Sequence, residues 1–500
     1  FRICRRPWSA LEKNFMSTAS SDPSDGWPSL LSRDDWIYTL LLTSSFLIAA
    51  AQRFALHGSA LYASLRLLGG PLGFFIALLV LKWKIFYSLP VVVFTIAVIH
   101  CGPLTRKMPL IVFSSVFSYL IFVRHLHQLV NLPELASQAN ALQLILTLRA
   151  IGLAYEVSDG RYHRENPGKL KPRRYLAEDP GILSSLNYFY HFCGLFTGPY
   201  YSFQCLEDSY DVHAEPFHTR YATGKGLFRE YRSRLMQLAV STPVFIFTNS
   251  LFPLDGLRSD AIWEWSILYR LFYAAMVFVV FRMRVYAAWA ISECVCVTLH
   301  IGIYPAASKP RSVVGPTDLA EFDKCWKSAE AESDSSAVVN IDIHEVEASD
   351  GFRSGVRAWN KSVQSWLALY VHSRAPPAFR MTLTMFVSAL WHGTYAGYFM
   401  SFMVVPMCTA MEDILFRLLP RDEHGKRSWL VQQIYIWTIR CRGFDFLATG
   451  FLLKNFADTH RFWSSLYYWL PLSMLAITAV LTIAERLCLR RPPKPSQKSD

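Results

Sequence analysis

The sequence predicts an all-α protein that crosses a membrane several times. Of its 500 residues, 52% are hydrophobic and 15% are aromatic, and the mean hydropathy is +0.21. The apolar residues gather in blocks of roughly 17 to 22 residues, which is the length a helix needs to cross about 30 Å of hydrocarbon. These two observations favour a polytopic α-helical membrane protein over a set of soluble domains.

Ten apolar blocks are candidate spans, and some of them carry an internal charge. The block from 381 to 411 is long enough for a broken or a double pass. In chain order the candidates are Trp36–Gln52, Leu61–Leu81, Ile85–Cys101, Pro109–Val123, Leu235–Leu254, Trp263–Phe281, Val285–Tyr304, Met381–Met411, Val431–Leu453 and Phe462–Ile483.

One further helical segment, Asn140–Glu156, carries Gln143 and Arg149 among leucines and isoleucines. Polar side chains at membrane depth are costly against lipid. The segment therefore predicts a helix that is buried against protein.

The aromatic segment Leu183–Gln204 is interrupted at Gly194 and again at Gly198-Pro199. Proline lacks a backbone donor and biases the preceding residue to extended geometry. We expect this segment to turn back on itself near the membrane.

Three segments differ in composition from the spans. Residues 305–349 form a long polar stretch with a Ser- and Glu-rich centre, which predicts a mobile surface loop. Residues 1–33 are polar and lack the apolar core of a cleaved signal peptide, and Met16 is a candidate start. The tail 487–500 is basic. We expect both ends to be disordered and residues 34–486 to form the membrane domain.

The net charge of +12 comes from short basic clusters beside the apolar blocks. Lys and Arg at such positions set topology or meet lipid phosphates, so membrane lipids are expected partners and nucleic acid is not. The ten cysteines include no C-x-x-C pair and no His/Cys cluster at zinc spacing, so no metal site is predicted. The basic clusters beside the apolar blocks are Arg106–Lys107, Arg173–Arg174, Arg282 with Arg284, and Arg490–Arg491.

His392 is the readily titratable side chain of the charge-free stretch Met381–Met411. An imidazole has an unperturbed pKa near neutrality, so it can exchange a proton where few other groups can. Ionisable groups inside a membrane usually mark a transport path or a reaction site. Trp391 and Gly393 flank His392, and Gly393 and Gly397 permit close backbone approach.

A helix over Trp359–Val371 would place an apolar face on one side. Asn360 falls within that face and Gln364 lies on its edge. A buried carboxamide costs free energy unless it finds partners, so either a structural hydrogen bond or a role in a site would explain Asn360. The apolar face consists of Trp359, Val363, Trp366, Leu367, Tyr370 and Val371.

The pattern WN-x-S-V-Q-x-W (Trp359–Trp366), with a WHG whose His392 lies 32 residues beyond Asn360, resembles the membrane-bound O-acyltransferase family. The resemblance extends over roughly residues 34–486 and is closest to the lysophosphatidylinositol acyltransferases, although Arg161–Arg174 and Ser312–Val338 match poorly. The H-x-x-x-x-D signature of the other large class of glycerolipid acyltransferases is absent. Supporting stretches are Gly194–Phe203, Phe281–Cys296, Ile301–Pro305, Asn340–Asp342, Trp359–Ala368, Ser388–Phe402 and Ala457–Trp463.

The resemblance implies a bundle of about 10–11 transmembrane helices with re-entrant or amphipathic segments around a central reaction chamber. It implies acyl-CoA as co-substrate, no permanently bound cofactor, residence in the endoplasmic reticulum, and a lysophospholipid acceptor. Lysophosphatidylinositol is the favoured acceptor, and polyunsaturated chains such as arachidonoyl are the favoured donors. His392 would be the general base on the sn-2 hydroxyl, and Asn360 would orient that hydroxyl or stabilise developing charge.

Further candidate substrate contacts come from the same motifs. The two arginines would bind phosphate, although arginines at the end of a span are more often interfacial anchors. Acylation of Cys193 is disfavoured because no activating base is evident. The candidates are Trp359, Gln364, Trp391, Gly393, Gly198, Pro199, Tyr200, Arg282 and Arg284.

Three alternatives stay open at this point. The chain could acylate another lysophospholipid, a sterol or a protein. It could be a transporter in which His392 and Asn360 line a permeation path, although no inverted repeat is evident. It could also be a membrane scaffold, although a scaffold would be expected to have lost one of these two residues. Protein partners and membrane orientation stay open.

Overall fold

The computed structural model describes residues 31–55, 68–101, 106–130, 135–170, 173–211, 214–223, 225–419 and 429–489. These residues are almost entirely helical, and the two strands found among them, β1 (Tyr304–Pro305) and β2 (Ser333–Asp334), pair antiparallel. The predicted all-α class is confirmed. Most of residues 1–33, including Met16, and residues 490–500 of the tail lie outside the described residues.

The chain divides into two compact units. Unit 1 holds the described residues up to Leu251, together with Val280–Asp342 and Trp359–Ala375. Unit 2 holds Phe252–Val279, Ile343–Ala358 and the described residues from Pro376 onward. The long helix α12 (Ile267–Thr298) contributes to both units.

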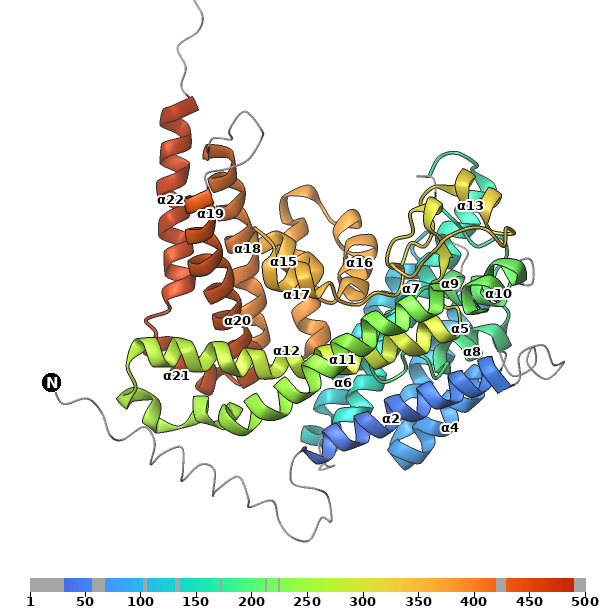
Figure 1. Ribbon diagram of the computed structural model, residues 1–500, viewed down its shortest axis with the longest axis horizontal. Coiled ribbons are helices and arrows are strands. Elements are labelled where there is room, and N and C mark those ends of the chain that lie inside the picture. The colour runs from blue at the N-terminus through green and yellow to red at the C-terminus, as the bar shows by residue number, and fades with distance from the viewer. Residues whose placement is uncertain are drawn as a thin grey trace, which may run out of the picture. The chain divides into compact units, whose positions relative to one another are not determined.

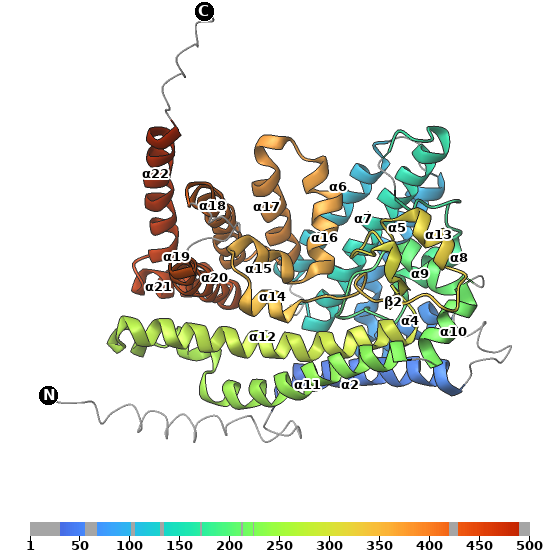
Figure 2. The same ribbon diagram turned by 45° about the horizontal axis from the view of Figure 1, so that its top comes forward.

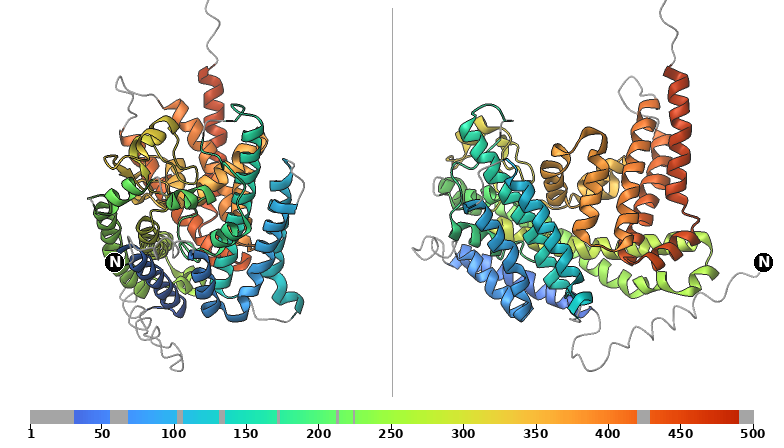
Figure 3. Two further views of the ribbon diagram at one scale, coloured as in Figure 1. Left: turned by 90° about the vertical axis from the view of Figure 1, so that its right-hand side faces the viewer. Right: turned by 180° about the vertical axis from the view of Figure 1, so that it is seen from behind.

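Unit 1 is built around α7 (Ser137–Glu165), with α4 to α7 lying side by side in Figure 3. Of the most apolar window in α7, 78% is buried, against 33% or less in the other candidate spans. The expected burial of this polar helix against protein is therefore confirmed. The helices around it are α2 (Arg33–Ala50) with a π turn (Ala51–Ala55), α4 (Gly69–Leu81), a 3-10 turn (Lys82–Ser88), α5 (Leu89–Cys101), α6 (Met108–Val130), α8 (Ile182–Tyr190), α9 (Phe203–Tyr210), α10 (Glu215–Thr223), α11 (Lys225–Leu251) and α16 (Lys361–Tyr370) with the 3-10 turn His372–Arg374.

The polar stretch 305–349, predicted as a mobile loop, is folded over much of its length. It contains a 3-10 turn (Ala306–Ser308), α13 (Leu319–Cys325), β2 and α14 (Ile343–Ala348). Just before it the Tyr304 hydroxyl donates to Asp208 (2.8 Å), and the Trp326 Nε1 donates to Asp211 (2.7 Å), so α13 lies beside α9 in Figures 1 and 2. Aromatic side chains such as Phe322 and Trp326 are buried in it, which average composition did not predict.

In unit 2 the helices α18 (Ala396–Leu418), α20 (Arg442–Leu453) and α22 (Trp469–Leu489) run together, coloured orange to red in Figure 1. The Glu412 carboxylate of α18 accepts from the backbone nitrogens of Phe352 and Arg353 and from the Tyr435 hydroxyl. This carboxylate thereby caps α15 with an anion at its N-terminus. The remaining elements are α15 (Phe352–Ala358), 3-10 turns Leu254–Arg258, Asp260–Glu264 and Pro377–Phe379, α17 (Arg380–His392), α19 (Trp429–Tyr435), a π turn (Ile436–Cys441) and α21 (Phe456–Ser465).

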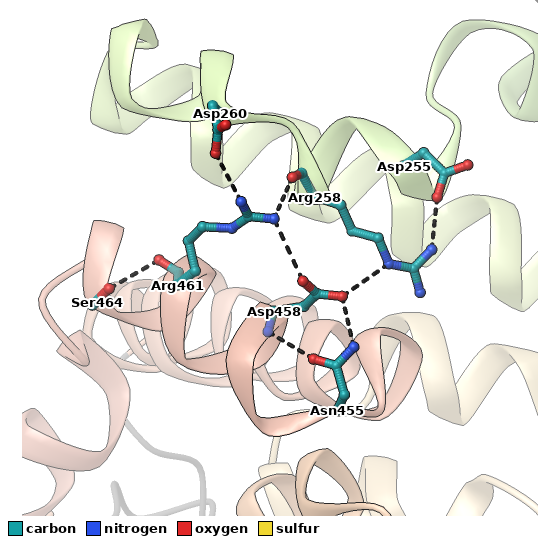
Figure 4. Close-up of polar contacts among 7 residues, drawn as sticks. All are labelled: Asp255, Arg258, Asp260, Asn455, Asp458, Arg461 and Ser464. Carbon is teal, nitrogen blue, oxygen red and sulfur yellow. Dashed lines mark hydrogen bonds and ion pairs between the residues drawn. The ribbon is translucent and has the colours of Figure 1, made fainter.

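Helix α21 is joined by ion pairs to the two 3-10 turns that precede α12, all within unit 2 (Figure 4). Asp458 binds Arg258 (3.2 Å), and Arg461 binds Asp260 (2.8 Å). Asn455 caps α21 by accepting from the Asp458 backbone nitrogen (2.7 Å). The motif Ala457–Trp463, quoted above for the family resemblance, therefore has a structural role here. Asp260 is highly exposed, so its ion pair stabilises little and mainly fixes geometry.

Eight helical stretches among the described residues are long and apolar enough to span a membrane, which makes this a multi-pass membrane protein. The predicted polytopic all-α architecture is therefore confirmed. Trp263–Phe281 and Val285–Tyr304 form the single 32-residue helix α12, because Arg282 and Arg284 do not interrupt a helix as Gly or Pro would. The stretch Gly69–Cys101 differs from α12, because Lys82 takes a positive φ (53°) and a 3-10 turn separates α4 from α5, so two of the predicted blocks stay separate here. Part of the predicted Leu61–Leu81 lies outside the described residues.

Two of the predicted blocks are interrupted. The block 381–411 is broken between α17 and α18, as expected. Phe462–Ile483 was predicted as one span but divides between α21 and α22, because Tyr467 and Tyr468 take left-handed backbone angles (φ 55° and 48°). The predicted block Val431–Leu453 is helical but passes through a π turn.

Helices α18 and α20 touch through glycine backbones, and this contact is testable. The Gly397 nitrogen donates to the Lys454 carbonyl (2.6 Å), and a Cβ at Gly397 would overlap the Gly450 carbonyl oxygen. We expect Gly397→Ala to destabilise the protein by about 1–3 kcal/mol, because backbone cannot move aside as a side chain can. Thermal unfolding of the detergent-purified chain measures this. Gly181→Ala, whose Cβ meets nothing within 4 Å, is the matched control, and equal losses would contradict the prediction.

Candidate active site

His392 is the last residue of α17, in unit 2, and four aromatic rings surround its half-buried imidazole. The ring centroids lie 4.6 Å away for Trp391, 5.0 Å for Phe451, 5.3 Å for Phe402 and 6.0 Å for Tyr398. Phe451 meets the imidazole at an interplanar angle of 89°. The histidine thus lies in a largely apolar setting built by α17, α18 and α20.

Small residues bring these rings to the histidine. A Cβ at Gly393 would lie 2.6 Å from the Tyr398 ring, so only glycine leaves room for that ring. The close contact of Gly397 with Gly450 draws α18 onto α20, which carries Phe451. Ser401 of α18 reinforces the contact by donating to the Leu447 carbonyl (2.7 Å). The close backbone approach predicted for the two glycines is confirmed at Gly397, whereas Gly393 makes room for a side-chain ring.

Asn360 lies in unit 1, immediately before α16. The helix was predicted to begin at Trp359, but it begins at Lys361, and Asn360 takes a left-handed conformation (φ 46°, ψ 55°). Asn is one of the few non-glycine residues that tolerate this region. Its carbonyl accepts from the Gln364 nitrogen (2.9 Å), while its side-chain Oδ1 is buried and accepts no hydrogen bond from the described residues.

The apolar face of α16 is packed much as predicted. Val363, Leu367, Tyr370 and Val371 are buried, and Trp366 is fully buried with its Nε1 donating to the Leu148 carbonyl of α7 (3.1 Å). Trp359, which precedes the helix, stacks on Phe281 of α12 at 6.1 Å between ring centroids. Ser362 lies outside the predicted apolar face but is fully buried and hydrogen-bonded, which apolar periodicity does not show.

Three separate sequence motifs meet at the Ser362 hydroxyl. It donates to the Asn340 Oδ1 (2.5 Å) and accepts from the Tyr200 nitrogen (3.0 Å). The Asn340 carbonyl accepts from the Lys361 nitrogen (2.7 Å). The segment of Gly198, Pro199 and Tyr200 is thereby attached to the start of α16, next to Asn360.

The turns predicted at Gly194 and Gly198 are confirmed, with φ of 67° and 122°. A Cβ at Gly198 would overlap the Ser292 Oγ, which donates to the Thr197 carbonyl (2.9 Å). Position 198 therefore requires glycine for both its backbone angle and its contact with α12. Cys193 is fully buried with its Sγ 3.1 Å from the Sγ of Cys296.

Arg149 of α7 holds the segment that leads to this turn. Its buried guanidinium donates to the carbonyls of Tyr188, Phe189, His191 and Cys193 and to the Tyr201 hydroxyl, at 2.7 to 3.3 Å. Burial and the nearby Arg149 guanidinium lower the pKa of His191 to about 3, so this imidazole is neutral at pH 7. The composition of residues 140–156 predicted that this helix is buried, but it did not predict which groups accept hydrogen bonds from Arg149.

The predicted substrate contacts fall in different places. Arg284 pairs with Asp35 of α2 (2.5 Å), so its guanidinium has a protein partner. Arg282 lies on the same helix, α12, and Gln364 is half-buried in the first turn of α16. Trp391 is buried beside His392. In the described ranges no three His, Cys, Asp or Glu residues gather to hold a metal.

Two functional supports were missed by sequence reasoning. Glu293 of α12 and Arg234 of α11 form a buried ion pair (3.1 Å), and the second oxygen of Glu293 accepts from the Asn340 nitrogen (2.8 Å). On α7, Glu156 accepts from the nitrogens of Phe203 and Gln204 at the start of α9. Glu293 and Glu156 each lie in an apolar run of the sequence, and a carboxylate in such a run could have indicated a buried polar contact.

The long apolar helices, one of them broken next to His392, define a polytopic membrane protein. Residues 104–442 match the membrane-bound O-acyltransferase (MBOAT) family. The chain is 50% identical over 463 residues to a membrane-bound acylglycerophosphatidylinositol O-acyltransferase of Caenorhabditis briggsae, covering 92% of this chain and 98% of that protein. The chain belongs to the membrane-bound O-acyltransferase family and is an O-acyltransferase.

Two further relatives carry the same descriptive name. The one from Caenorhabditis elegans is 52% identical over 446 residues, which is 89% of this chain and 94% of that protein. The human one is 33% identical over 401 residues, which is 78% of this chain and 82% of that protein. The similarity is therefore carried by nearly the whole length of the chain.

The five hydrogen bonds of Arg149 predict a large stability effect. Arg149→Met removes all five hydrogen bonds, although the Tyr201 hydroxyl still donates to the Cys193 carbonyl (2.9 Å), and we expect a loss of about 3–5 kcal/mol. Arg284→Met is the matched control, because that side chain is 45% exposed and its ion pair contributes about 1 kcal/mol or less. Thermal unfolding of both purified variants makes the comparison, and similar melting temperatures would refute the role given to Arg149.

Proposed function

We propose that the chain transfers a long-chain acyl group from acyl-CoA to the sn-2 hydroxyl of a lysophospholipid. Lysophosphatidylinositol is the preferred acceptor, and polyunsaturated chains such as arachidonoyl are the preferred donors. The single observation that carries the proposal is the 50% and 52% identity, over 92% and 89% of this chain, to two proteins named acylglycerophosphatidylinositol O-acyltransferases. The setting of the reaction is phospholipid remodelling in the endoplasmic reticulum membrane.

His392 acts as the general base in this proposal. A lipid hydroxyl is far too weak an acid to ionise at neutral pH, so a base must take its proton as the oxygen attacks. The oxygen forms a bond to the thioester carbonyl carbon, the carbon–sulfur bond breaks, and CoA leaves as the thiolate. The aromatic rings of Trp391, Phe402 and Phe451 shield the imidazole from water, and general-base help contributes roughly 10²- to 10⁴-fold.

Asn360 orients the acceptor or stabilises the developing charge. Its buried Oδ1 accepts no hydrogen bond from the described residues, and such a group is costly to leave unsatisfied, by about 1–3 kcal/mol. A substrate hydroxyl is a donor of the kind that would satisfy it. A carboxamide held on a fixed turn is also preorganised to face the charge that forms in the transition state.

The other candidate contacts have supporting roles in the proposal. Gln364 and Trp359 flank Asn360, and Gly393 allows the ring of Tyr398 to approach. The segment Gly198–Tyr200 contributes through its attachment to α16. Arg282 and Arg284 both stay candidates for contact with a lipid phosphate, and Arg284 also pairs with Asp35.

Replacing the base gives the first functional test. We expect His392→Ala to lower acyl transfer by roughly 10²- to 10⁴-fold while the protein is still expressed. The assay follows labelled acyl-CoA in membranes of expressing cells, with protein quantified by immunoblot. His125→Ala, on a different helix, α6, is the matched control and is expected to keep normal turnover. Survival of turnover in His392→Ala would show that another group is the base.

The acceptor assignment is tested with a panel of lysophospholipids. We expect lysophosphatidylinositol to react at least about 10-fold faster than lysolipids with choline, ethanolamine or serine headgroups. A site that hydrogen-bonds the inositol hydroxyls would have its own polar groups left unpaired when a lysolipid with another headgroup binds. An sn-2-specific phospholipase should release the labelled chain from the product. Equal rates across headgroups would overturn the inositol preference, and resistance to the lipase would overturn the sn-2 position.

A further inference from the structure

The first turn of α16 is tied to Asn340 by two hydrogen bonds. The Lys361 nitrogen donates to the Asn340 carbonyl (2.7 Å), and the Ser362 hydroxyl donates to the Asn340 Oδ1 (2.5 Å). Ser362 is fully buried and Asn340 is 1% exposed. The two residues that follow Asn360 are therefore held by one buried side chain and its backbone.

Asn340 is itself fixed by a buried ion pair. Its nitrogen donates to one oxygen of Glu293 (2.8 Å), whose other oxygen lies 3.1 Å from the Nε of Arg234. Arg234 also pairs with Glu230 (2.6 Å), one turn earlier on α11. Buried charges that are paired and hydrogen-bonded form a rigid support, since each charge loses its partner if any member moves. This support belongs to the helices α11 and α12.

The turn at Asn360 needs such a support. A left-handed conformation costs a non-glycine residue roughly 1–2 kcal/mol, so it persists only where the surroundings impose it. On one side, Trp359 packs against Phe281 and Trp289 of α12. On the other side, Lys361 and Ser362 are held by Asn340. The backbone of Asn360 is thus fixed at both ends.

We propose that Ser362 and Asn340 are positioning residues that hold the carboxamide of Asn360 in its reactive orientation, through the buried relay from Arg234 and Glu293. The inference rests on the proposed function of Asn360 and extends it. Neither residue needs to touch the substrate for this role. The Ser362 hydroxyl also holds the Tyr200 nitrogen (3.0 Å), so the same relay sets the turn that begins at Gly198.

A double-mutant cycle on the full-length purified enzyme tests the relay. Ser362→Ala is expected to lower kcat by about 10-fold, which corresponds to the loss of one or two hydrogen bonds, and to leave KM for both substrates within about twofold. In an Asn360→Ala background, the same change should lower kcat by less than about twofold, because the group it positions is gone. Ser365→Ala, three residues along the same helix, is the matched control and should be neutral in both backgrounds.

Asn340→Ala removes the hydrogen bond between Ser362 and Asn340 by deleting its acceptor, and it leaves the bond from the Tyr200 nitrogen to Ser362 in place. It must therefore also lower kcat less in the Asn360→Ala background than in the unmodified enzyme. Multiplicative losses for both variants in the Asn360→Ala background would overturn the relay and leave the proposed function intact. A kcat for Asn360→Ala equal to that of the unmodified enzyme would instead overturn the proposed role of Asn360. If Ser362→Ala fails to fold, the result with Asn340→Ala decides.

Discussion

The guanidinium of Arg149 can be buried in α7 only because its donors find acceptors, and those acceptors are main-chain carbonyls of one short segment together with the Tyr201 hydroxyl. The donors satisfy carbonyls at the C-terminal end of α8 and beyond, where helical bonding has ended. By holding the chain between Tyr188 and Tyr201, Arg149 brings the Tyr200 nitrogen to Ser362, and through Ser362 to Asn340 and the turn at Asn360. The arrangement of the residues around Asn360 in unit 1 therefore depends on the hydrogen bonds of Arg149.

In unit 2 the surroundings of His392 are held by packing and not by a buried charge. Close contact of glycine backbones, at Gly397 and Gly450, brings α18 against α20, and aromatic rings then enclose His392. Small residues are how helices pack in a membrane, where lipid competes equally for apolar side chains. The surroundings of His392 in unit 2 are thus built by close packing, whereas the turn at Asn360 in unit 1 is held by a polar network. Substitutions in the two supports should differ accordingly in how they affect stability.

The chain passes from unit 2 to unit 1 directly before the candidate amide, between Ala358 and Trp359. Glu412 holds the preceding helix α15 within unit 2, and Asn340 holds the following helix α16 within unit 1. Asn360 is therefore the second residue of this part of unit 1, and its left-handed turn is held within that unit. In the motif around Asn360, Trp359 and Ser362 anchor the turn on its two sides.

Much of this protein follows from its sequence. Apolar length determines that the helices span a membrane, and a lone imidazole among apolar residues marks His392, because burying polar groups in lipid is costly wherever they fall. The polar helix 140–156 was predicted as protein-buried for the same reason. The start of α16 and the partners of Arg149, Ser362 and Glu293 were decided only by tertiary structure. They depend on hydrogen bonds between residues more than 20 positions apart, which local periodicity cannot register, since it reports only which face of a segment is apolar.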